Sequence, residues 1–158
     1  MTDAPRFRHE RLGQHDRADF VCSREPTLQN YLVNNGLAKR DNEGHVSAVY
    51  VLLDTHSSDR IAGYFTLSNA SIVPSVAQSV TKKLNKYPAY GATKLGKLAR
   101  HDDYPGLGLG VLLLECAYRE VLASNSATMG LIVDAINPKL AEIASRELCK
   151  STELSGVC

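Results

Sequence analysis

The four cysteines of the sequence, Cys22, Cys116, Cys149 and Cys158, include no Cys-x-x-Cys pair and show no regular spacing. This pattern argues against a zinc site and a disulfide framework, and Cys116, within an apolar helical run, is expected in the core. The sequence also has no run of roughly 18 apolar residues and no apolar stretch near its first residue. We therefore expect no metal, no membrane partner and a cytoplasmic location.

Acidic residues are absent from one long span. No Asp or Glu lies between Arg60 and His101, and the basic residues of this span are Arg60, Lys82, Lys83, Lys86, Lys94, Lys97 and Arg100. Because the formal net charge of the whole chain is only +1, the remainder is net acidic and the fold should have a basic side. Such a side fits either a nucleic-acid backbone or a solvated, lysine-rich loop.

The length and the apolar pattern predict a single domain over residues 1–158, because a chain of 158 residues that is 44% hydrophobic can bury a core. Strands are predicted at 7–11, 47–54, 61–73, 93–100 and 129–136, and the second and third should form a hairpin. A helical region capped by Ser23 is either bent or split at Asn35-Gly36, and further helices should begin near Leu109 and at Asn137. This order predicts an α/β fold with a mixed sheet (α+β).

The stretch "HDDYPGLGLGVLLLECAYREVL", residues 101–122, places three glycines between a predicted strand and a predicted helix. It is not a dinucleotide fingerprint, since Val111 and Leu113 stand where the last glycine would be, and it lacks the Gly-Lys-Ser/Thr of a Walker motif. Unblocked backbone N–H groups and the positive end of a helix dipole can bind a pyrophosphate at such a turn. The alternative is a turn that only lets the strand re-enter a helix closely.

The segment "LGKLARHDDYPGLGLGVLLLECA" resembles motif A of GNAT-superfamily N-acetyltransferases, in which a (Gln/Arg)-x-x-Gly-x-Gly/Ala loop binds acetyl-CoA. Aligned in this way, Gly108 and Gly110 are the motif glycines, and Pro105 stands where Gln or Arg is usual. The segments "FVCSREPTLQNYLVNNGLAKRDNEGHVSAVYVLLD", "IAGYFTLSNASI" and "KYPAYGATKLGKLARH" are similar to the GNAT toxins of toxin–antitoxin operons. That subgroup acetylates the α-amine of aminoacyl-tRNA, and the resemblance covers roughly residues 20–137.

The resemblance implies a GNAT acyl-CoA N-acyltransferase fold with acetyl-CoA as the cosubstrate. The backbone of Leu98, Ala99 and Arg100 would pair with the pantetheine arm like an added strand. The pyrophosphate would lie on the loop that consists of Pro105, Gly106, Leu107, Gly108, Leu109, Gly110 and Val111. Asn137 would help to define the cofactor cleft, although an Asn-Pro pair is also an ordinary helix start.

The resemblance also favours a tRNA surface over a solvated loop for the basic span. The residues expected to bind RNA, with Tyr87 and Tyr90 interleaved for stacking, are Lys82, Lys83, Lys86, Lys94 and Lys97. The partners that the resemblance implies are an aminoacyl-tRNA and an antitoxin protein.

The C-terminal part departs from the family pattern. Ala144 occupies the position of the tyrosine that usually protonates the departing CoA thiolate, so no catalytic residue is assigned. No closing strand is recognisable in an irregular tail of about residues 149–158, which would leave a sheet edge open and favour a homodimer or a partner. Four functions remain open: an active aminoacyl-tRNA acetyltransferase, an impaired relative that still binds acetyl-CoA, a GNAT enzyme for a small or protein amine, and a non-enzymatic RNA-binding module.

Overall fold

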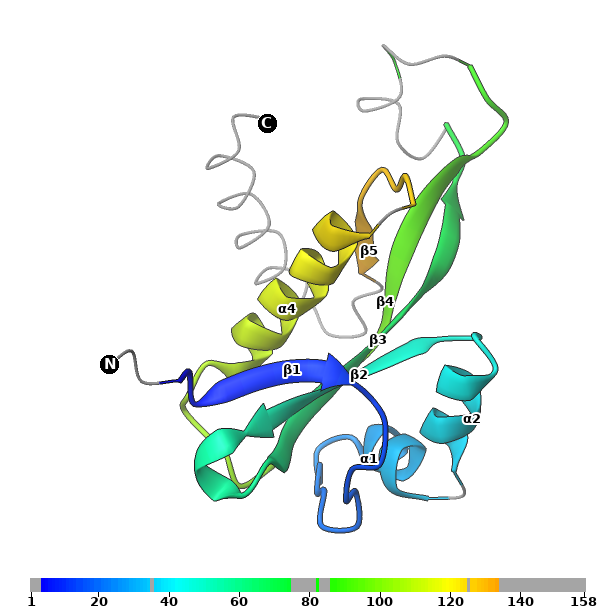
Figure 1. Ribbon diagram of the computed structural model, residues 1–158. Helices are drawn as coiled ribbons and strands as arrows, with labels where there is room; N and C mark the ends of the chain where they lie inside the picture. The colour runs from blue at the N-terminus through cyan, green and yellow to red at the C-terminus, as the bar shows by residue number, and fades with distance from the viewer. Residues whose placement is uncertain (1–3, 35, 75–81, 83–85, 125, 134–158) are drawn as a thin grey trace.

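The computed structural model describes residues 4–34, 36–74, 82, 86–124 and 126–133, and these form a mixed sheet with helices on both faces (Figure 1). The strands follow one another across the sheet in sequence order: β1 (Phe7–Arg11), β2 (Ala48–Asp54), β3 (Arg60–Ile72), β4 (Tyr90–Arg100) and β5 (Leu131–Val133). The first three pairings are antiparallel and β4 pairs with β5 in parallel. The predicted mixed α+β class is therefore confirmed.

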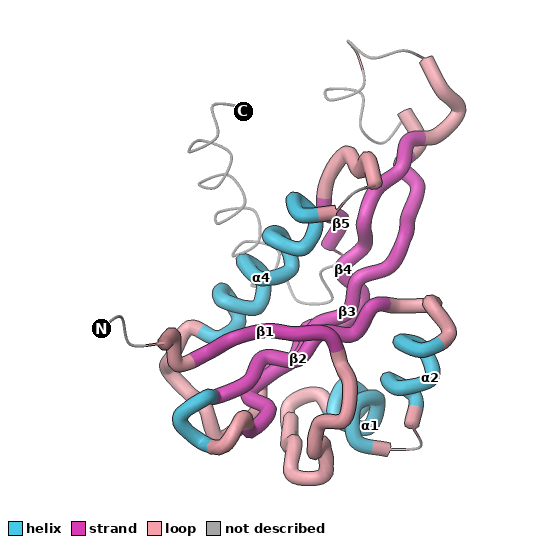
Figure 2. The backbone as a smooth tube through the Cα atoms, in the orientation of Figure 1, coloured by secondary structure: helices cyan, strands magenta, loops and turns pink. Residues whose placement is uncertain are grey.

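In the described part of the chain, three α-helices cover this sheet. Helices α1 (Pro26–Val33) and α2 (Leu37–Glu43) lie on one face and α4 (Leu109–Ala123) lies on the other (Figure 2). The helical region is split rather than bent, because Gly36 adopts the left-handed conformation (φ 65°) at the start of α2. The predicted Ser23 cap is wrong: α1 begins after Glu25 without a side-chain cap, and the Ser23 N–H instead donates to the carboxylate of Asp102.

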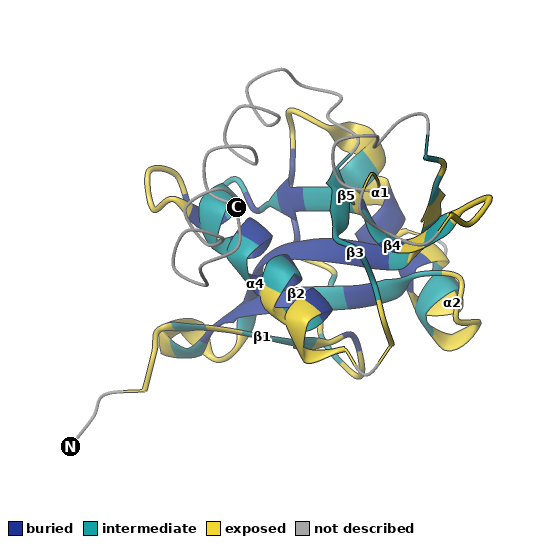
Figure 3. Ribbon diagram, turned by 90° about the horizontal axis from the view of Figure 1, so that it is seen from above, coloured by how far each residue is buried: buried dark blue, intermediate teal, exposed yellow. Residues whose placement is uncertain are grey.

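The core has two parts, one on each face of the sheet, so that the middle of β3 is buried on both sides (Figure 3). Phe20, Leu32 and Tyr64 belong to the part under α1 and α2, whereas Phe65 and Leu113 belong to the part under α4. This alternation follows from the two-residue period of a strand. The cluster under α4 also contains Cys116, a free and buried thiol, which confirms its predicted core position.

Two strands differ from the sequence prediction by more than one residue. Strand β4 begins three residues earlier than expected, because residues 90–92 pair with the far end of β3. That end of β3, residues 68–72, pairs with β4 but not with β2, so the two strands extend beyond the sheet as a two-stranded arm (Figure 1). The last predicted strand, 129–136, is described over Leu131–Val133 alone, and residues 134–158 lie outside the described part.

Within the described residues, no helix is long and apolar enough to cross a bilayer.

Candidate functional site

A β-bulge at Gly96 changes the direction of β4 in mid-strand. Leu67 pairs with Leu95 and Thr66 pairs with Lys97, so Gly96 is the extra residue of β4. The bulge is held by a hydrogen bond of 2.9 Å from the Lys97 N–H to the Thr66 hydroxyl. A bulge shifts the alternation of side chains by one position. Lys97 therefore points to the α1 face, where its ammonium lies 4.3 Å from the centre of the Tyr31 ring.

Within the described residues, the second half of β4 has an open edge. Strand β5 pairs with residues 93–95 of β4, and no described strand continues along that edge to Arg100. The N–H groups of Lys97 and His101 point toward β3, where they donate to the Thr66 hydroxyl and the Ala62 carbonyl. Backbone direction alternates along a strand, so Leu98 and Arg100 present their N–H and C=O groups to the open edge. Ala99, the third residue predicted to pair with pantetheine, directs its backbone toward β3.

The glycine-rich loop leads from this open edge into α4, as predicted. Gly106 and Gly108 have φ angles of 70° and 67°, and a Cβ at either position would meet no atom within 4 Å. Helix α4 begins after Gly108 with no side-chain cap and no acidic residue in its first turn. Its first intrahelical bond to Gly108 comes from Leu112, so the N–H groups of residues 109–111 are free of intrahelical acceptors. The loop therefore offers several N–H donors and a positive helix end at one place.

The N-terminal part of α4 sits unusually close to the sheet at Gly63, which pairs with Arg100. A Cβ at Gly63 would lie 2.8 Å from the Ala99 carbonyl oxygen and 3.0 Å from Leu113 Cδ1. The distance to the Ala99 oxygen is shorter than real Cβ contacts and the distance to Leu113 is tight, so a glycine fits best where β3 lies between β4 and α4. The contact fixes the start of α4 beside the end of β4, which places the loop next to the open edge.

His101, which directly follows β4, is 1% exposed and joins the loop to a distant part of the chain. Its Nδ1 accepts the Asp103 N–H at 3.1 Å, and its Nε2 lies 2.9 Å from the Asp19 carbonyl oxygen. A ring nitrogen that accepts carries no proton, so the bond from the Asp103 N–H assigns the proton to Nε2, which also lies 3.2 Å from Arg60 Nη2. The rings of Phe20 and Tyr104 stand edge-on to the imidazole. Sequence reasoning missed this residue, although its place between strand and loop was a signal.

Arg60 binds the same two loops through their carboxylates. Its guanidinium lies 2.6 Å from Asp19 and 2.7 Å from Asp103, and these hydrogen bonds raise the pKa of Arg60. Arg60 opens the acid-free span of the sequence, but its charge is neutralised by these partners. The basic side of the molecule must therefore come from the lysines and Arg100.

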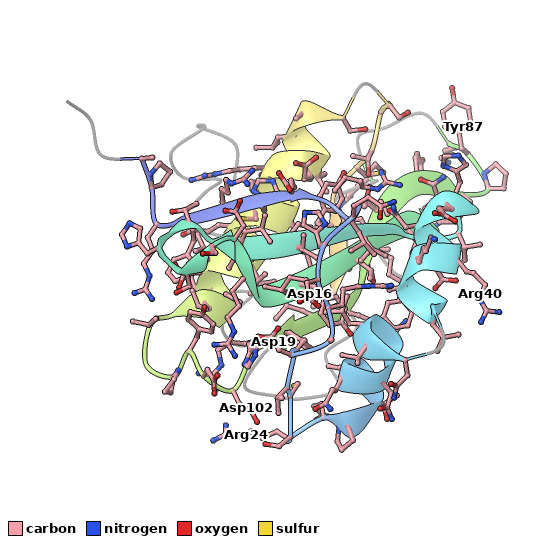
Figure 4. All side chains as sticks on the ribbon, turned by 60° about the horizontal axis from the view of Figure 1, so that its bottom comes forward. Asp16, Asp19, Arg24, Arg40, Tyr87 and Asp102 are labelled. Carbon is pink, nitrogen blue, oxygen red and sulfur yellow. The ribbon has the colours of Figure 1, made fainter. Side chains whose placement is uncertain are left out.

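The lysines of the acid-free span belong to the β3–β4 hairpin, since residues 61–100 comprise both strands and their connection. Lys82 and Lys86 are exposed, whereas Lys94 and Lys97 are partly buried. Near the arm, Tyr87 is 56% exposed, packs edge-on against Tyr90 at 5.9 Å and projects away from the body of the molecule (Figure 4). Three predicted positions, Lys83, Asn137 and Ala144, lie outside the described residues.

Two cavities lie away from the glycine-rich loop. One, of about 790 Å³, is lined by charged residues that include Asp16, Asp19 and Arg60. Asp16 and Asp19 are labelled in Figure 4. The other, of about 250 Å³, lies beside Tyr50 and Glu120, and the Glu120 carboxylate is 2.8 Å from His9. Within the described ranges, no three His, Cys, Asp or Glu side chains come together as a metal site requires.

No family model matches the chain. Among solved structures, AtaT complexed with acetyl-methionyl-tRNAfMet is 25% identical, with a TM-score of 0.76 over 90% of this chain and 85% of that one. A Tyr-to-Phe variant of KacT is 26% identical, with a TM-score of 0.74 and the same coverage of both chains. A Tyr-to-Phe variant of AtaT, bound to the C-terminus of the antitoxin AtaR and to acetyl-CoA, is 22% identical with a TM-score of 0.65 over 92% of this chain and 84% of that one. These neighbours are GNAT-fold toxins of type II toxin–antitoxin systems, and the fold expected from the sequence is confirmed.

Proposed function

We propose that this chain, which has the GNAT fold of the toxins AtaT and KacT, is an acetyl-CoA-dependent N-acetyltransferase that acetylates the α-amine of aminoacyl-tRNA. One observation carries the proposal: the open edge of β4 runs directly into a glycine-rich loop at the start of α4. AtaT, which shares this fold, is known in complexes with acetyl-CoA and with acetyl-methionyl-tRNAfMet.

The residues at this edge fit the chemistry of acetyl-CoA. The backbone groups of Leu98 and Arg100 match the amides of a pantetheine arm, which would add to β4 as a strand does. The N–H groups of residues 109–111 match the diphosphate, which needs donors and a positive helix end. Cβ atoms are absent at Gly106 and Gly108, so the backbone can approach the phosphates closely. Bound here, acetyl-CoA supplies the activated acyl carbon of its thioester.

The reaction makes modest demands on protein side chains. A free α-amine has a pKa of about 7.7–8.0, and a neighbouring ester lowers it, so much of the acceptor is neutral near pH 7. The amine nitrogen forms a bond to the acyl carbon as the carbon–sulfur bond breaks, and the proton lost by nitrogen balances the one gained by the thiolate. The chain contributes mainly position, with backbone N–H groups that polarise the carbonyl.

We propose that the acceptor substrate, aminoacyl-tRNA, binds to the β3–β4 hairpin. Its lysines suit a phosphate backbone, and the exposed ring of Tyr87 suits an unpaired acceptor end that stacks on aromatic side chains. We assign the binding of tRNA to Lys82, Lys83, Lys86, Lys94 and Lys97. AtaT is known bound to the antitoxin AtaR, and we propose an antitoxin protein as a second partner and a homodimer as the assembly.

Transfer of a labelled acetyl group tests the proposal. Purified protein is incubated with acetyl-CoA labelled in the acetyl group and with total aminoacylated tRNA, and label in precipitated tRNA is counted. Uncharged tRNA is the matched control, since it lacks the α-amine. Label should enter charged tRNA and not uncharged tRNA. Label that enters small amines or proteins instead would favour the broader GNAT alternative.

A second candidate is an impaired relative that binds acetyl-CoA without turning it over, and Ala144 is the observation that favours it. In that case calorimetry detects acetyl-CoA binding, but the transfer assay shows no label in the tRNA. The Ala144→Tyr variant should then raise activity, whereas Ala144→Phe, which lacks the hydroxyl, should not. No response to Ala144→Tyr would contradict this explanation of the defect.

A further inference from the structure

The glycine-rich loop lacks the polar side chain that its resemblance leads one to expect, because Pro105 has neither a charge nor a donor. An arginine from outside the loop lies at the same place. The Arg100 guanidinium donates from Nη1 to the Tyr104 carbonyl oxygen at 3.1 Å. That carbonyl forms the peptide bond to Pro105, so the guanidinium lies against the first residue of the loop.

The Arg100 guanidinium forms no ion pair with a described carboxylate, although, after the hydrogen bonds from Ser23, its charge is a minor cause of the lowered pKa of Asp102. Arg6, Arg8 and Arg60 each form an ion pair with an aspartate. Among the described residues, no carboxylate lies within 4.0 Å of the Arg100 guanidinium. Asp102, close in sequence, accepts the Ser23 N–H at 3.0 Å instead. Arg100 is therefore a partly buried cation beside the glycine-rich loop. The helix that follows this loop, α4, has no acidic residue in its first turn.

We propose that the Arg100 side chain binds the diphosphate of acetyl-CoA and replaces the side chain that is missing at Pro105. This inference rests on the proposed function. A guanidinium carries five N–H donors, and a single bond to Tyr104 leaves the others for phosphate oxygens. Arg100 then acts twice: its backbone faces the open edge of β4 and its side chain faces the phosphates. Such charge-assisted bonds are about twice as strong as neutral ones.

Affinities for two ligands that differ in the phosphates test the proposal. The Arg100→Gln variant keeps a donor for the Tyr104 carbonyl but loses the charge, and Arg100→Leu loses both. Dissociation constants are measured by calorimetry for acetyl-CoA and, by competition, for S-acetylpantetheine, which has no phosphate. Both variants should bind acetyl-CoA roughly 10- to 100-fold more weakly and bind S-acetylpantetheine as the wild type does. Arg119→Leu, on the exposed side of α4, is the matched control and should change neither affinity.

A second-site variant separates phosphate binding from a role in folding. Adding Pro105→Arg to Arg100→Leu should restore most of the affinity for acetyl-CoA, because a cation returns to the same turn. Unchanged acetyl-CoA affinity in Arg100→Gln, or an equal loss for both ligands, would overturn this proposal and leave the proposed function intact. A wild-type chain that binds neither ligand would overturn both.

Discussion

The backbone N–H of Asp103 donates to the imidazole Nδ1 of His101 at 3.1 Å, inside the turn that joins β4 to the glycine-rich loop. The opposite nitrogen, Nε2, bonds the carbonyl of Asp19, which is 82 residues away in the sequence. The imidazole thus links the start of the loop to the segment before α1. The orientation of the candidate cofactor site depends on this link and on the position of α4.

Replacing His101 should destabilise the fold because its imidazole is buried and hydrogen-bonds two backbone groups. His101→Leu leaves the Asp103 N–H and the Asp19 carbonyl without partners, at a cost of about 1–3 kcal/mol for each group. His101→Asn keeps an acceptor near the Nδ1 position and should lose less. Urea unfolding followed by circular dichroism measures both. Equal losses in the two variants would contradict a role for the Nδ1 hydrogen bond.

The carboxylate of Asp54 should make the fold sensitive to acid. Asp54 is fully buried, and two hydrogen bonds of 3.1 Å from Arg6 hold the pKa of its carboxyl well below the usual value. A lowered folded-state pKa stabilises the protein above the unfolded pKa of about 3.9, and this stabilisation is lost as the pH falls through the folded-state pKa.

The free energy of unfolding in urea, measured from pH 7 down to pH 3, tests this dependence. It should fall below about pH 5 in the wild type. Asp54→Asn should be less stable at pH 7, and its free energy of unfolding should fall less steeply with decreasing pH in the acid range. Arg6→Met, which leaves the carboxylate in place without its main partner, should also flatten the slope. A wild-type slope retained in Asp54→Asn would contradict the assignment.

Two glycines of the loop should respond to alanine in opposite ways. Gly108 has a left-handed backbone, so Gly108→Ala should cost about 1 kcal/mol of stability and weaken acetyl-CoA binding. Gly110 lies in the first turn of α4 without a positive φ, and Gly110→Ala should stabilise the helix by about 0.5–1 kcal/mol. The family motif accepts Ala at that position, so binding should persist. Melting curves with and without acetyl-CoA distinguish the two variants, and equal behaviour would contradict the loop geometry.

The exposed lysines near the arm should contribute to tRNA affinity but not to acetyl-CoA affinity. Lys82→Gln and Lys86→Gln each remove a charge, and each should weaken tRNA binding while lowering the slope of log K against log salt by about 1. Lys39→Gln is the control, because Lys39 lies on α2 and pairs with Glu43 at 3.8 Å. Filter binding at several salt concentrations measures the effect. If Lys39→Gln weakens tRNA binding as much as the other two variants do, tRNA affinity depends on the overall charge of the protein and not on the lysines near the arm.

The periodic parts of the sequence predicted the fold well. The β2–β3 hairpin follows from two apolar runs around a polar turn. The apolar stripe after the glycines predicted a helix that begins near residues 109–111, and α4 begins at Leu109. The resemblance added the fold family and placed the loop residues beside the end of β4. These features depend on local sequence, where side-chain period and turn residues carry the signal.

The features that shape the site depend on contacts far apart in sequence. A glycine inside a strand can mark a bulge, but the bulge at Gly96 is held by the Thr66 hydroxyl of the neighbouring strand, which lies 30 or more residues away in the sequence. The partners of Arg60 are Asp19 and Asp103, more than 40 residues away on either side. Lys97 was predicted to bind RNA, but its contact with Tyr31 depends on the direction that the bulge imposes. Such pairings become visible only in three dimensions.

Mass spectrometry of the tRNA terminus tests the proposed activity most directly. The protein is incubated with acetyl-CoA and total aminoacylated tRNA, the tRNA is digested with nuclease, and the 3′-terminal adenosines with their esterified amino acids are identified. We predict N-acetyl-aminoacyl-adenosine for at least one amino acid, dependent on both acetyl-CoA and the protein. If the α-amines of every amino acid remain free while acetyl-CoA binds at the loop, the chain is not an aminoacyl-tRNA acetyltransferase.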